Sequence, residues 1–336
     1  MSDRIRTAVV GAGKMGSIHA KVYSQLPESE LVAVVDIDQA KAAQLAEKYG
    51  CPAFTDGTEI LDKVDAVTIA TPTTTHLQLA KPFLRHRIPV LIEKPLASSV
   101  REGRKIVSLA RRYDTVVAVG HSERCNPVVQ AMKRFSIEPK FIEAHRVSPY
   151  PFRSTDVGVV LDIMIHDIDI VLSLANSKLR RVDAVGVNVI GDSEDICNAR
   201  ITFDNGCIAN LTASRLALKT ERRVHVFTRQ AYLSVDYLKK TGIVIKTDPN
   251  KNVVEWIRQQ QQQRGDFNPA GVNWLDLLHI EPLEIDDKEP IRLEQEAFLR
   301  AIKDRSFRPE VSAEEGLAAL RCAQQILRAV KKHKWD

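Results

Sequence analysis

The sequence is poor in the features that mark metal-binding or disulfide-bonded proteins. It has five cysteines among 336 residues, and no two of them lie closer than ten residues along the chain. A Cys-x-x-Cys pair is therefore missing, which argues against a zinc knuckle and against a disulfide framework. This cysteine usage is typical of a reducing compartment, and no bound metal is expected.

Long apolar runs and concentrated charge are also missing. No run approaches the length of a membrane span, and the first apolar stretch, Ile5–Val10, is too short for a signal-peptide core. The net charge is only +5, and basic residues alternate with acidic ones except in the run Lys331–Lys334. We therefore expect no nucleic-acid partner and no membrane partner, and we predict a cytoplasmic protein that acts on small molecules.

Chain length and apolar content indicate two domains with separate cores. Of the 336 residues 44% are hydrophobic, and a single core rarely serves a chain of this length. In the first part, short apolar runs alternate with segments of helical periodicity, which indicates a parallel sheet covered on both faces. We predict a doubly wound α/β Rossmann domain over residues 1–122. Its strands are expected at Ile5–Val10, Leu31–Val35, Ala66–Ala70, Val90–Ile92 and Val116–Val119.

The remainder, residues 123–336, has a different pattern. A long apolar helix is predicted at Asp156–Ala175, and short strands then follow one another without helices between them. This clustering predicts an α+β domain with a large, mostly antiparallel open sheet. Two closing helices, Leu293–Lys303 and Ala313–Lys331, can pack back on the first domain. The strands are expected at Val182–Ile190, Cys197–Phe203, Cys207–Ala213, Arg223–Thr228, Tyr232–Asp236 and Ile243–Lys246.

A glycine-rich loop joins the first predicted strand to the first helix. In the run Gly11-Ala12-Gly13-Lys14-Met15-Gly16, the first glycine permits a tight turn, the second admits a diphosphate, and the third allows close packing. A diphosphate then lies at the positive end of the helix. We expect Gly11, Gly13, Lys14, Met15 and Gly16 to bind a dinucleotide; the alternative is a glycine-rich turn without a ligand.

An acidic residue after the second strand bears on the choice of cofactor. Asp36 lies 20 residues beyond Gly16, and Ile37 follows it with no arginine close behind. A carboxylate here accepts hydrogen bonds from the adenosine ribose and repels a 2′-phosphate. The sequence therefore predicts that Asp36 and Ile37 bind NAD rather than NADP.

Two later loops lie at the carboxyl ends of predicted strands, where ligands of such sheets bind. The first contains Thr71, Pro72, Thr73 and His76, which we expect near the cofactor; helix capping by the threonines and a surface position for His76 are the alternatives. The second is Glu93-Lys94-Pro95. We expect Glu93 and Lys94 at the cofactor, with Lys94 stabilising an alkoxide, although this tripeptide taken alone is more typical of a surface turn.

The predicted long helix carries polar residues in an apolar setting. At 3.6 residues per turn, Asp162, His166 and Asp169 share one face and Asp167 points away. The shared face would let a carboxylate orient the imidazole, and His166 can then accept a proton from a substrate hydroxyl. The alternatives are a metal site, for which no third ligand is evident, and a structural histidine.

These motifs together resemble the Gfo/Idh/MocA family of sugar and polyol oxidoreductases. The most specific parts are Glu93-Lys94-Pro95 and the Asp162-x-x-x-His166 pair. The resemblance covers nearly the whole chain and implies a catalytic triad of Lys94, Asp162 and His166. It also implies that the open sheet of the second domain forms a homo-oligomer, a dimer or a tetramer.

Three further segments are similar to the family branch that oxidises UDP-N-acetylglucosamine at C3. They are the residues 120–127, 153–158 and 165–169. A sugar nucleotide carries negative charge that arginines bind, so the expected substrate contacts are Arg124, Asn126 and Arg153 together with Lys94, Asp162 and His166. Arg146 and Arg215 are weaker candidates because each fits a surface ion pair as well.

The sequence thus predicts an NAD-dependent dehydrogenase of a sugar nucleotide, acting on C3 of UDP-N-acetylglucosamine in amino-sugar or lipid A biosynthesis. Two alternatives remain open. One is a dehydrogenase of a free sugar or polyol such as glucose or myo-inositol, and the other is a non-catalytic sensor that binds NAD. The presence of Lys94, Asp162 and His166 together favours an enzyme.

Overall fold

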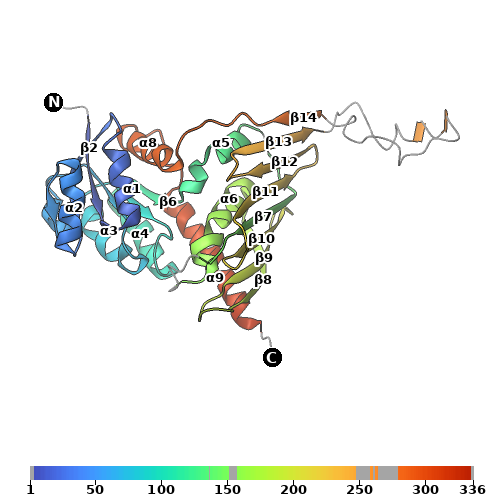
Figure 1. Cartoon of the computed structure of the whole chain (residues 1–336), viewed down its shortest axis with the longest axis horizontal. Coiled ribbons are helices and arrows are strands. Elements are labelled where there is room, and N and C mark those ends of the chain that lie inside the picture. The colour runs from blue at the N-terminus through green and yellow to red at the C-terminus, as the bar shows by residue number, and fades with distance from the viewer. Residues whose placement is uncertain are drawn as a thin grey trace.

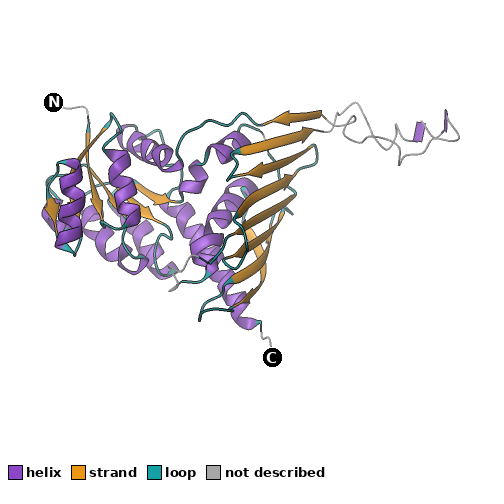
Figure 2. Ribbon diagram, viewed as in Figure 1, coloured by secondary structure: helices purple, strands orange, loops and turns teal. Residues whose placement is uncertain are grey.

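The computed structural model describes residues 4–135, 137–150, 157–246, 258–259, 262–263 and 279–333. The predicted helix start at Asp156 and the predicted substrate contact Arg153 lie outside these residues. Within the described part, no helix combines the length and the apolar content needed to cross a membrane. Figures 1 and 2 show two sheets with helices α5, α6 and α9 between them.

The first sheet has the predicted doubly wound topology. All of its strands are parallel, in the order β3-β2-β1-β4-β5-β6, which is the Rossmann order. Strands β4, β5 and β6 are buried throughout because helices cover both faces. The strands are β1 Ile5–Val10, β2 Ser29–Val35, β3 Ala53–Phe54, β4 Ala66–Ile69, β5 Val90–Glu93 and β6 Val117–Gly120; the helices are α1 Lys14–Tyr23, α2 Gln39–Tyr49, α3 His76–Arg85 and α4 Val100–Arg112.

The second sheet is mostly antiparallel, as predicted. Its order is β14-β13-β12-β11-β7-β10-β9-β8, and β7 and β10 form its one parallel pair among the described residues. The α/β plus α+β fold class predicted from the sequence is thereby confirmed. The strands are β7 Phe141–Val147, β8 Leu179–Val187, β9 Ile196–Phe203, β10 Ile208–Ser214, β11 Glu221–Phe227, β12 Ala231–Asp236, β13 Thr241–Lys246 and β14 His279–Pro282.

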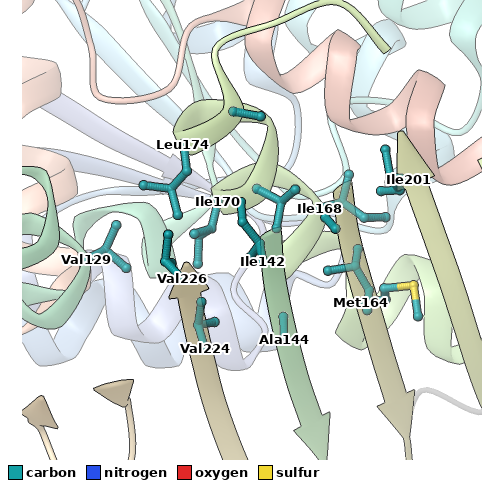
Figure 3. Close-up of a cluster of buried hydrophobic side chains, with 14 of the residues drawn as sticks. Val129, Ile142, Ala144, Met164, Ile168, Ile170, Leu174, Ile201, Val224 and Val226 are labelled. Atoms are coloured by element: carbon teal, nitrogen blue, oxygen red, sulfur yellow. The ribbon is translucent and has the colours of Figure 1, made fainter. Parts of the chain in front are cut away.

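Helices α5 (Pro127–Lys133) and α6 (Ile165–Ala175) lie on one face of this sheet. Along β9, buried residues alternate with exposed or half-buried ones, so only one face of the strand is covered. Figure 3 shows Ile168 and Ile170 of α6 against Ile142 of β7 and Val226 of β11. The opposite face of the sheet carries no described helix.

The two closing helices complete the first domain as well as the second. Helix α8 (Pro290–Lys303) places Phe298 and Leu299 in the core that α1 and α2 share with the first sheet. Helix α9 (Ala313–Lys332) joins the core on the other face of that sheet through Leu317 and Leu320. Further along, Ile326 and its neighbours enter the core of the second sheet. The domain division at residues 122 and 123 stays a prediction, since the closing helices serve both parts.

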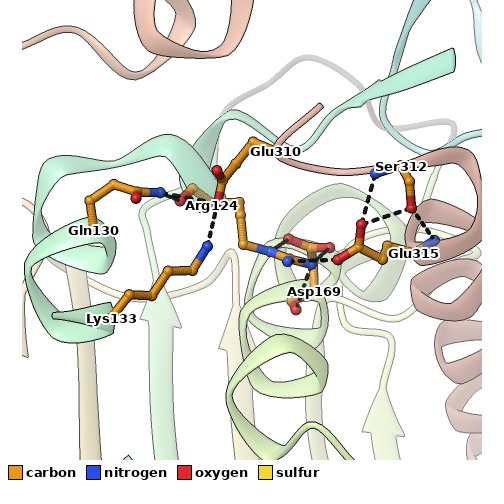
Figure 4. A network of polar contacts seen from close by, with 7 residues as sticks. All are labelled: Arg124, Gln130, Lys133, Asp169, Glu310, Ser312 and Glu315. Carbon is orange, nitrogen blue, oxygen red and sulfur yellow. Dashed lines mark hydrogen bonds and ion pairs between the residues drawn. The ribbon is translucent and has the colours of Figure 1, made fainter. Parts of the chain in front are cut away.

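A buried charge network fastens these parts to one another (Figure 4). Arg124, in the 3-10 helix Ser122–Cys125, donates to both carboxylate oxygens of Asp169 on α6, at 2.8 and 2.6 Å. It also donates to Glu315 of α9 at 3.1 Å. Both Arg124 and Asp169 are almost fully buried. The pairing is needed because an unpaired charge at this depth is costly.

Removing the cation from this network should destabilise the fold. In Arg124→Met the Asp169 carboxylate loses its partner, so we expect the free energy of unfolding to fall by about 3–5 kcal/mol. The matched control is Arg111→Met, since Arg111 also pairs with a glutamate of α9, Glu314, but their side chains are 70% and 47% exposed. Its effect should stay within about 1 kcal/mol. Urea unfolding measures both, and equal effects would contradict a structural role for Arg124.

Candidate active site

A cavity of about 550 Å³ lies where the first sheet meets the second domain. The first domain contributes loops that follow the carboxyl ends of its parallel strands, which is where such sheets bind ligands. The second domain contributes residues of β7, β11 and the segment before α6. Among the residues that line the cavity are Lys14, Met15, Thr71, Glu93, Lys94, Asp162 and His166.

The loop Gly11–Gly16 has the geometry that a diphosphate requires. Gly11 has a φ of +104°, a conformation that favours glycine. A Cβ on Gly16 would lie 1.7 Å from the Gly11 carbonyl oxygen, so helix α1 can approach the loop this closely only through glycine. A Cβ on Gly13 would meet nothing within 4 Å. This open space at the N-terminus of α1 fits the diphosphate of a dinucleotide.

Asp36 holds this loop to the end of β2. Its carboxylate accepts hydrogen bonds from the backbone N–H of Ala12 at 2.7 Å and of Asp38 at 2.9 Å. Carboxylate oxygens accept more than one bond, so the ribose hydroxyls of a dinucleotide can still bind here. The next side chain, Ile37, is 94% exposed and contributes an apolar surface beside Asp36.

The threonine loop after β4 is divided between the cavity and the protein interior. Thr71 lines the cavity, whereas Pro72 and Thr73 lead into the 3-10 helix Thr73–Thr75 and do not line it. His76 is fully buried, and its ring nitrogens face the carbonyl oxygens of Thr71 at 3.0 Å and Pro95 at 3.1 Å. Burial lowers the pKa of His76. His76 therefore links the loop at Thr71 to the loop at Pro95. It does not lie at the cavity, where a cofactor contact was expected.

Lys94 and Asp162 meet across the two domains. The Lys94 ammonium donates to the Asp162 carbonyl oxygen at 2.7 Å and to its carboxylate at 3.2 Å. Their side chains are only 19% and 28% exposed, so solvent weakens this pair less than a surface pair. The pairing brings together two residues that lie 68 positions apart in the sequence.

Behind Lys94, a chain of buried polar groups leads to helix α8. Glu93 accepts the backbone N–H of Lys94 at 3.1 Å and the His19 Nε2–H at 2.8 Å. The other ring nitrogen of His19 accepts from Gln295 at 2.9 Å, which places the His19 proton on the Glu93 side. Burial raises the pKa of Glu93, but the hydrogen bonds and positive charges of His19 and Lys94 together outweigh it, and the pKa lies below its usual value.

The segment before α6 is a π-helical turn, Val160–Met164. Its start is fixed by Glu194, whose carboxylate accepts the Val160 N–H at 3.1 Å. A Cβ on Gly158 would lie 2.0 Å from the same carboxylate, so glycine is needed there. The wider turn changes the angular spacing of the residues that follow. A uniform 3.6-residue period therefore does not hold through this segment.

Two predictions about this segment were wrong. Asp167 does not point away from the site: it is 2% exposed and pairs with Arg146 of β7 at 2.7 Å, and Arg146 lines the cavity. Asp162 does not orient His166 by a hydrogen bond, since its carbonyl and carboxylate oxygens accept from Lys94 instead. His166 lines the cavity as predicted, while its Nδ1 atom is buried with no hydrogen-bond partner among the described residues.

The electrostatic setting of His166 keeps its ring neutral. Burial lowers the pKa of His166 well below its usual value, and the nearby charges of Lys94 and Arg146 lower it further. At neutral pH the imidazole is therefore unprotonated on one nitrogen and able to accept a proton. Lys94 and His166, which come from different domains, face the same cavity.

The predicted polar substrate contacts lie elsewhere. Arg124 is 3% exposed, bound to Asp169 and Glu315, and does not line the cavity. Asn126 caps α5 by accepting the Val128 N–H at 3.0 Å. Both residues follow the last strand of the first sheet. Their side chains point into the protein because their hydrogen-bond partners are buried there.

Of the weaker arginine candidates, one is at the cavity. Arg146 lines it, whereas Arg215 is 1% exposed and bound to Asp195 at 2.6 Å, outside the lining. Sequence reasoning missed Glu123 and Arg222, which also line the cavity. Glu123 lies in the segment 120–127 that resembles one branch of the family, and this resemblance could have indicated it. Arg222 lies in a strand whose sequence has no distinguishing pattern.

Acidic, cysteine and histidine side chains do not gather into a metal site in the described part of the chain. No group of three or more of them has a geometry that could hold a metal ion there.

Comparison with known proteins identifies the family of this chain. Residues 5–121 match the oxidoreductase family with an NAD-binding Rossmann fold named Gfo/Idh/MocA, and residues 138–234 match the C-terminal domain of the same family. The chain belongs to the Gfo/Idh/MocA family. The resemblance drawn from the sequence motifs is confirmed, and the protein is an NAD(P)-dependent oxidoreductase acting on CH–OH groups.

Its relatives include dehydrogenases of sugar nucleotides and of polyols. UDP-N-acetylglucosamine 3-dehydrogenase from Acidithiobacillus ferrooxidans is 37% identical over 238 residues, 70% of this chain and 75% of that protein. A solved structure of that enzyme has a TM-score of 0.87 at 31% identity and covers 98% of both chains. Inositol 2-dehydrogenase from Rubrobacter xylanophilus is 36% identical over 200 residues, 56% of this chain and 57% of that protein.

A side chain at Gly13 should block the dinucleotide without disturbing the fold. The backbone there has φ −72° and ψ −167°, which other residues adopt. For Gly13→Val we expect the affinity for NAD to fall by at least about tenfold, or about 1.4 kcal/mol, with little change in thermal midpoint. Gly191→Val is the matched control, because a Cβ there also meets nothing within 4 Å. Calorimetric titration with NAD measures the difference; unchanged affinity in Gly13→Val would refute the loop assignment.

Proposed function

We propose that this enzyme oxidises a secondary hydroxyl of a sugar nucleotide, C3 of UDP-N-acetylglucosamine, to the ketone with NAD as oxidant. The observation that carries the proposal is the convergence of Lys94 and His166 on the cavity that also holds the loop residues Lys14 and Met15. The 37% identical relative named UDP-N-acetylglucosamine 3-dehydrogenase supports the substrate. Amino-sugar biosynthesis, such as that of lipid A, is the proposed setting, in the cytoplasm.

In the proposed mechanism the reacting carbon loses a hydride and its hydroxyl oxygen loses a proton, which leaves a C=O group. His166 takes the proton as general base, a role that its neutral ring supports. Lys94 stabilises the negative charge that develops on the oxygen, and Asp162 positions the ammonium through its two hydrogen bonds. NAD, when bound, accepts the hydride.

The choice of NAD over NADP is also a proposal. Asp36 points its carboxylate at the loop that would hold the adenosine end, between Ala12 and Asp38. A 2′-phosphate at this place would meet a like charge, whereas ribose hydroxyls can donate to it. The expected cofactor contacts are therefore those of the loop Gly11–Gly16, Asp36, Ile37 and Thr71, with Glu93 and Lys94 at the reacting end.

The cavity offers cationic groups for an anionic substrate. Arg146 and Arg222 line it, and Glu123 lies between them at 3.3 and 3.5 Å. Arg222 is the more exposed of the two, with 40% of its side chain accessible, so it can turn toward a diphosphate more readily. Arg153 stays a predicted contact outside the described residues.

We further propose that the open sheet face joins copies of this chain in a homo-oligomer. Phe227 is 37% exposed and packs against Phe141 and Tyr232, with ring centroids 5.8 and 4.8 Å apart. Ile243 and Ile280 on neighbouring strands are 37% and 42% exposed. Apolar side chains gathered on an uncovered sheet face are typical of protein interfaces.

A second candidate function follows from the comparisons. A free polyol is a competing substrate class because a 36% identical relative is an inositol 2-dehydrogenase. It differs from the first proposal in needing no site for a nucleotide. A sensor that binds NAD without catalysis is less favoured, since Lys94, Asp162 and His166 all surround the cavity.

A substrate panel separates these functions. The enzyme is mixed with NAD or NADP, a ketone trap and one of UDP-N-acetylglucosamine, N-acetylglucosamine, glucose or myo-inositol, and reduction of the nicotinamide is followed by absorbance. We expect turnover with NAD and the sugar nucleotide. Turnover with myo-inositol or glucose in its place would overturn the substrate proposal, and no turnover with any substrate would favour the sensor.

Removing the ammonium should affect chemistry rather than cofactor binding. For Lys94→Met we expect kcat to fall by about a hundredfold or more, because the developing charge loses its stabilising group. The variant should still bind NAD, because the glycine loop and Asp36 hold the rest of the cofactor. Lys105→Met, on the exposed side of α4, is the matched control and should retain the wild-type rate. Steady-state kinetics and NAD titration test this, and a near wild-type kcat in Lys94→Met would defeat the role of Lys94.

A further inference from the structure

The three aspartates near His166 in the described residues all pair with basic side chains. Each one is bound by a basic side chain that comes from another element of the fold. The pairs are Asp162 with Lys94, Asp167 with Arg146, and Asp169 with Arg124. Within the described residues, His166 therefore lacks the carboxylate that commonly orients a catalytic histidine.

His166 still needs an acceptor on its inner side. A neutral imidazole that receives a proton at one nitrogen carries its own proton on the other. The Nδ1 atom of His166 is buried without a partner, so Nε2 is the nitrogen that faces the cavity. A general base working through Nε2 requires a group that accepts the Nδ1–H, because a buried donor without an acceptor is costly.

His121 is the neighbouring group with free accepting capacity. It follows the last residue of β6, is 1% exposed, and neither of its ring nitrogens has a hydrogen-bond partner in the described parts of the chain. Its ring lies against the ring of His166 at a centroid distance of 6.3 Å and an angle of 88°. Three unpartnered nitrogen atoms thus belong to two adjacent buried rings.

We propose that His121 is the positioning residue of His166, accepting a hydrogen bond from its Nδ1–H and thereby fixing the tautomer in which Nε2 is free to take the substrate proton. The proposal rests on the proposed function, in which His166 is the base. The bond forms as the two adjacent rings turn toward each other in the NAD complex, since catalytic hydrogen bonds are commonly long in the unliganded protein and shorten when ligands bind.

The surrounding charges suit this role. Burial lowers the pKa of His121; Asp169 and Glu93 raise it, whereas Arg124 and Lys94 lower it, and the net shift is downward. His166 faces Lys94, Arg146 and Arg222. Both imidazoles are consequently neutral at neutral pH, as a donor–acceptor pair of rings requires. A protonated His121 would instead repel the base.

A spectroscopic test reads the tautomer directly. The NAD-bound enzyme is labelled with ¹⁵N-histidine, and the His166 side-chain signals are assigned by their loss in His166→Gln. We expect the Nδ1–H tautomer in the wild type and a loss of this preference in His121→Phe. The Nε2–H tautomer in the wild type, or the same tautomer in both proteins, would overturn the proposal.

A kinetic test uses the same position. For His121→Phe we expect kcat to fall by about tenfold or more, while KM and the affinity for NAD stay within about twofold. His121→Asn and His121→Gln each present an amide oxygen near one of the lost nitrogens, so one of them should recover part of the rate. His86→Phe, an exposed histidine at the end of α3, is the matched control.

The outcomes remain distinguishable if a variant or the parent proposal fails. If His121→Phe does not fold, the Asn and Gln variants carry both measurements. If the wild type turns over no sugar nucleotide, the proposed function fails, while the tautomer of His166 still decides the role of His121. Equal kcat in the wild type and in all His121 variants would refute a positioning role.

Discussion

The structure depends on the neutralisation of buried charge where its two domains meet. Lys94 reaches Asp162 across the domain boundary, and Arg124 joins Asp169 to Glu315 of α9. A buried charge without its partner is far more costly than the pair is favourable, so these contacts fix geometry more than they add stability. Glu294 meets the same constraint differently: burial, and then its acidic neighbours, raise its pKa well above the usual value, which favours its neutral form.

The sequence predicted the features that local chemistry controls. The parallel strands, the glycine loop and the hairpin strands of the second sheet follow from apolar periodicity and from the conformational freedom of glycine, which a single chain reveals. Lys94 could be placed at the cavity because any residue directly after a strand of a doubly wound sheet lies at the binding edge. His166 could be predicted as a site residue because an imidazole within an apolar segment is unusual.

What the sequence could not predict depends on partners distant along the chain. Arg124 follows a strand of the first sheet, as Lys94 does, yet its guanidinium points inward to Asp169 and Glu315. No residue close to Arg124 in the sequence predicts these two partners. Asp167 is buried because Arg146 of β7 pairs with it, and that strand lies 21 positions away in the sequence. Arg222 reaches the cavity only because β11 pairs with β7 in the sheet.

Helix α9 has a consequence for how ligands enter and leave. Its first turns belong to the core of one domain and its later turns to the core of the other. Many two-domain enzymes open around a hinge made of a few flexible residues. Here such an opening would have to pull a continuous helix out of one of two close-packed interiors. Exchange of substrate and product is therefore expected to proceed through the mouth of the cavity and by rearrangement of its loops, with the two domains held at a fixed angle.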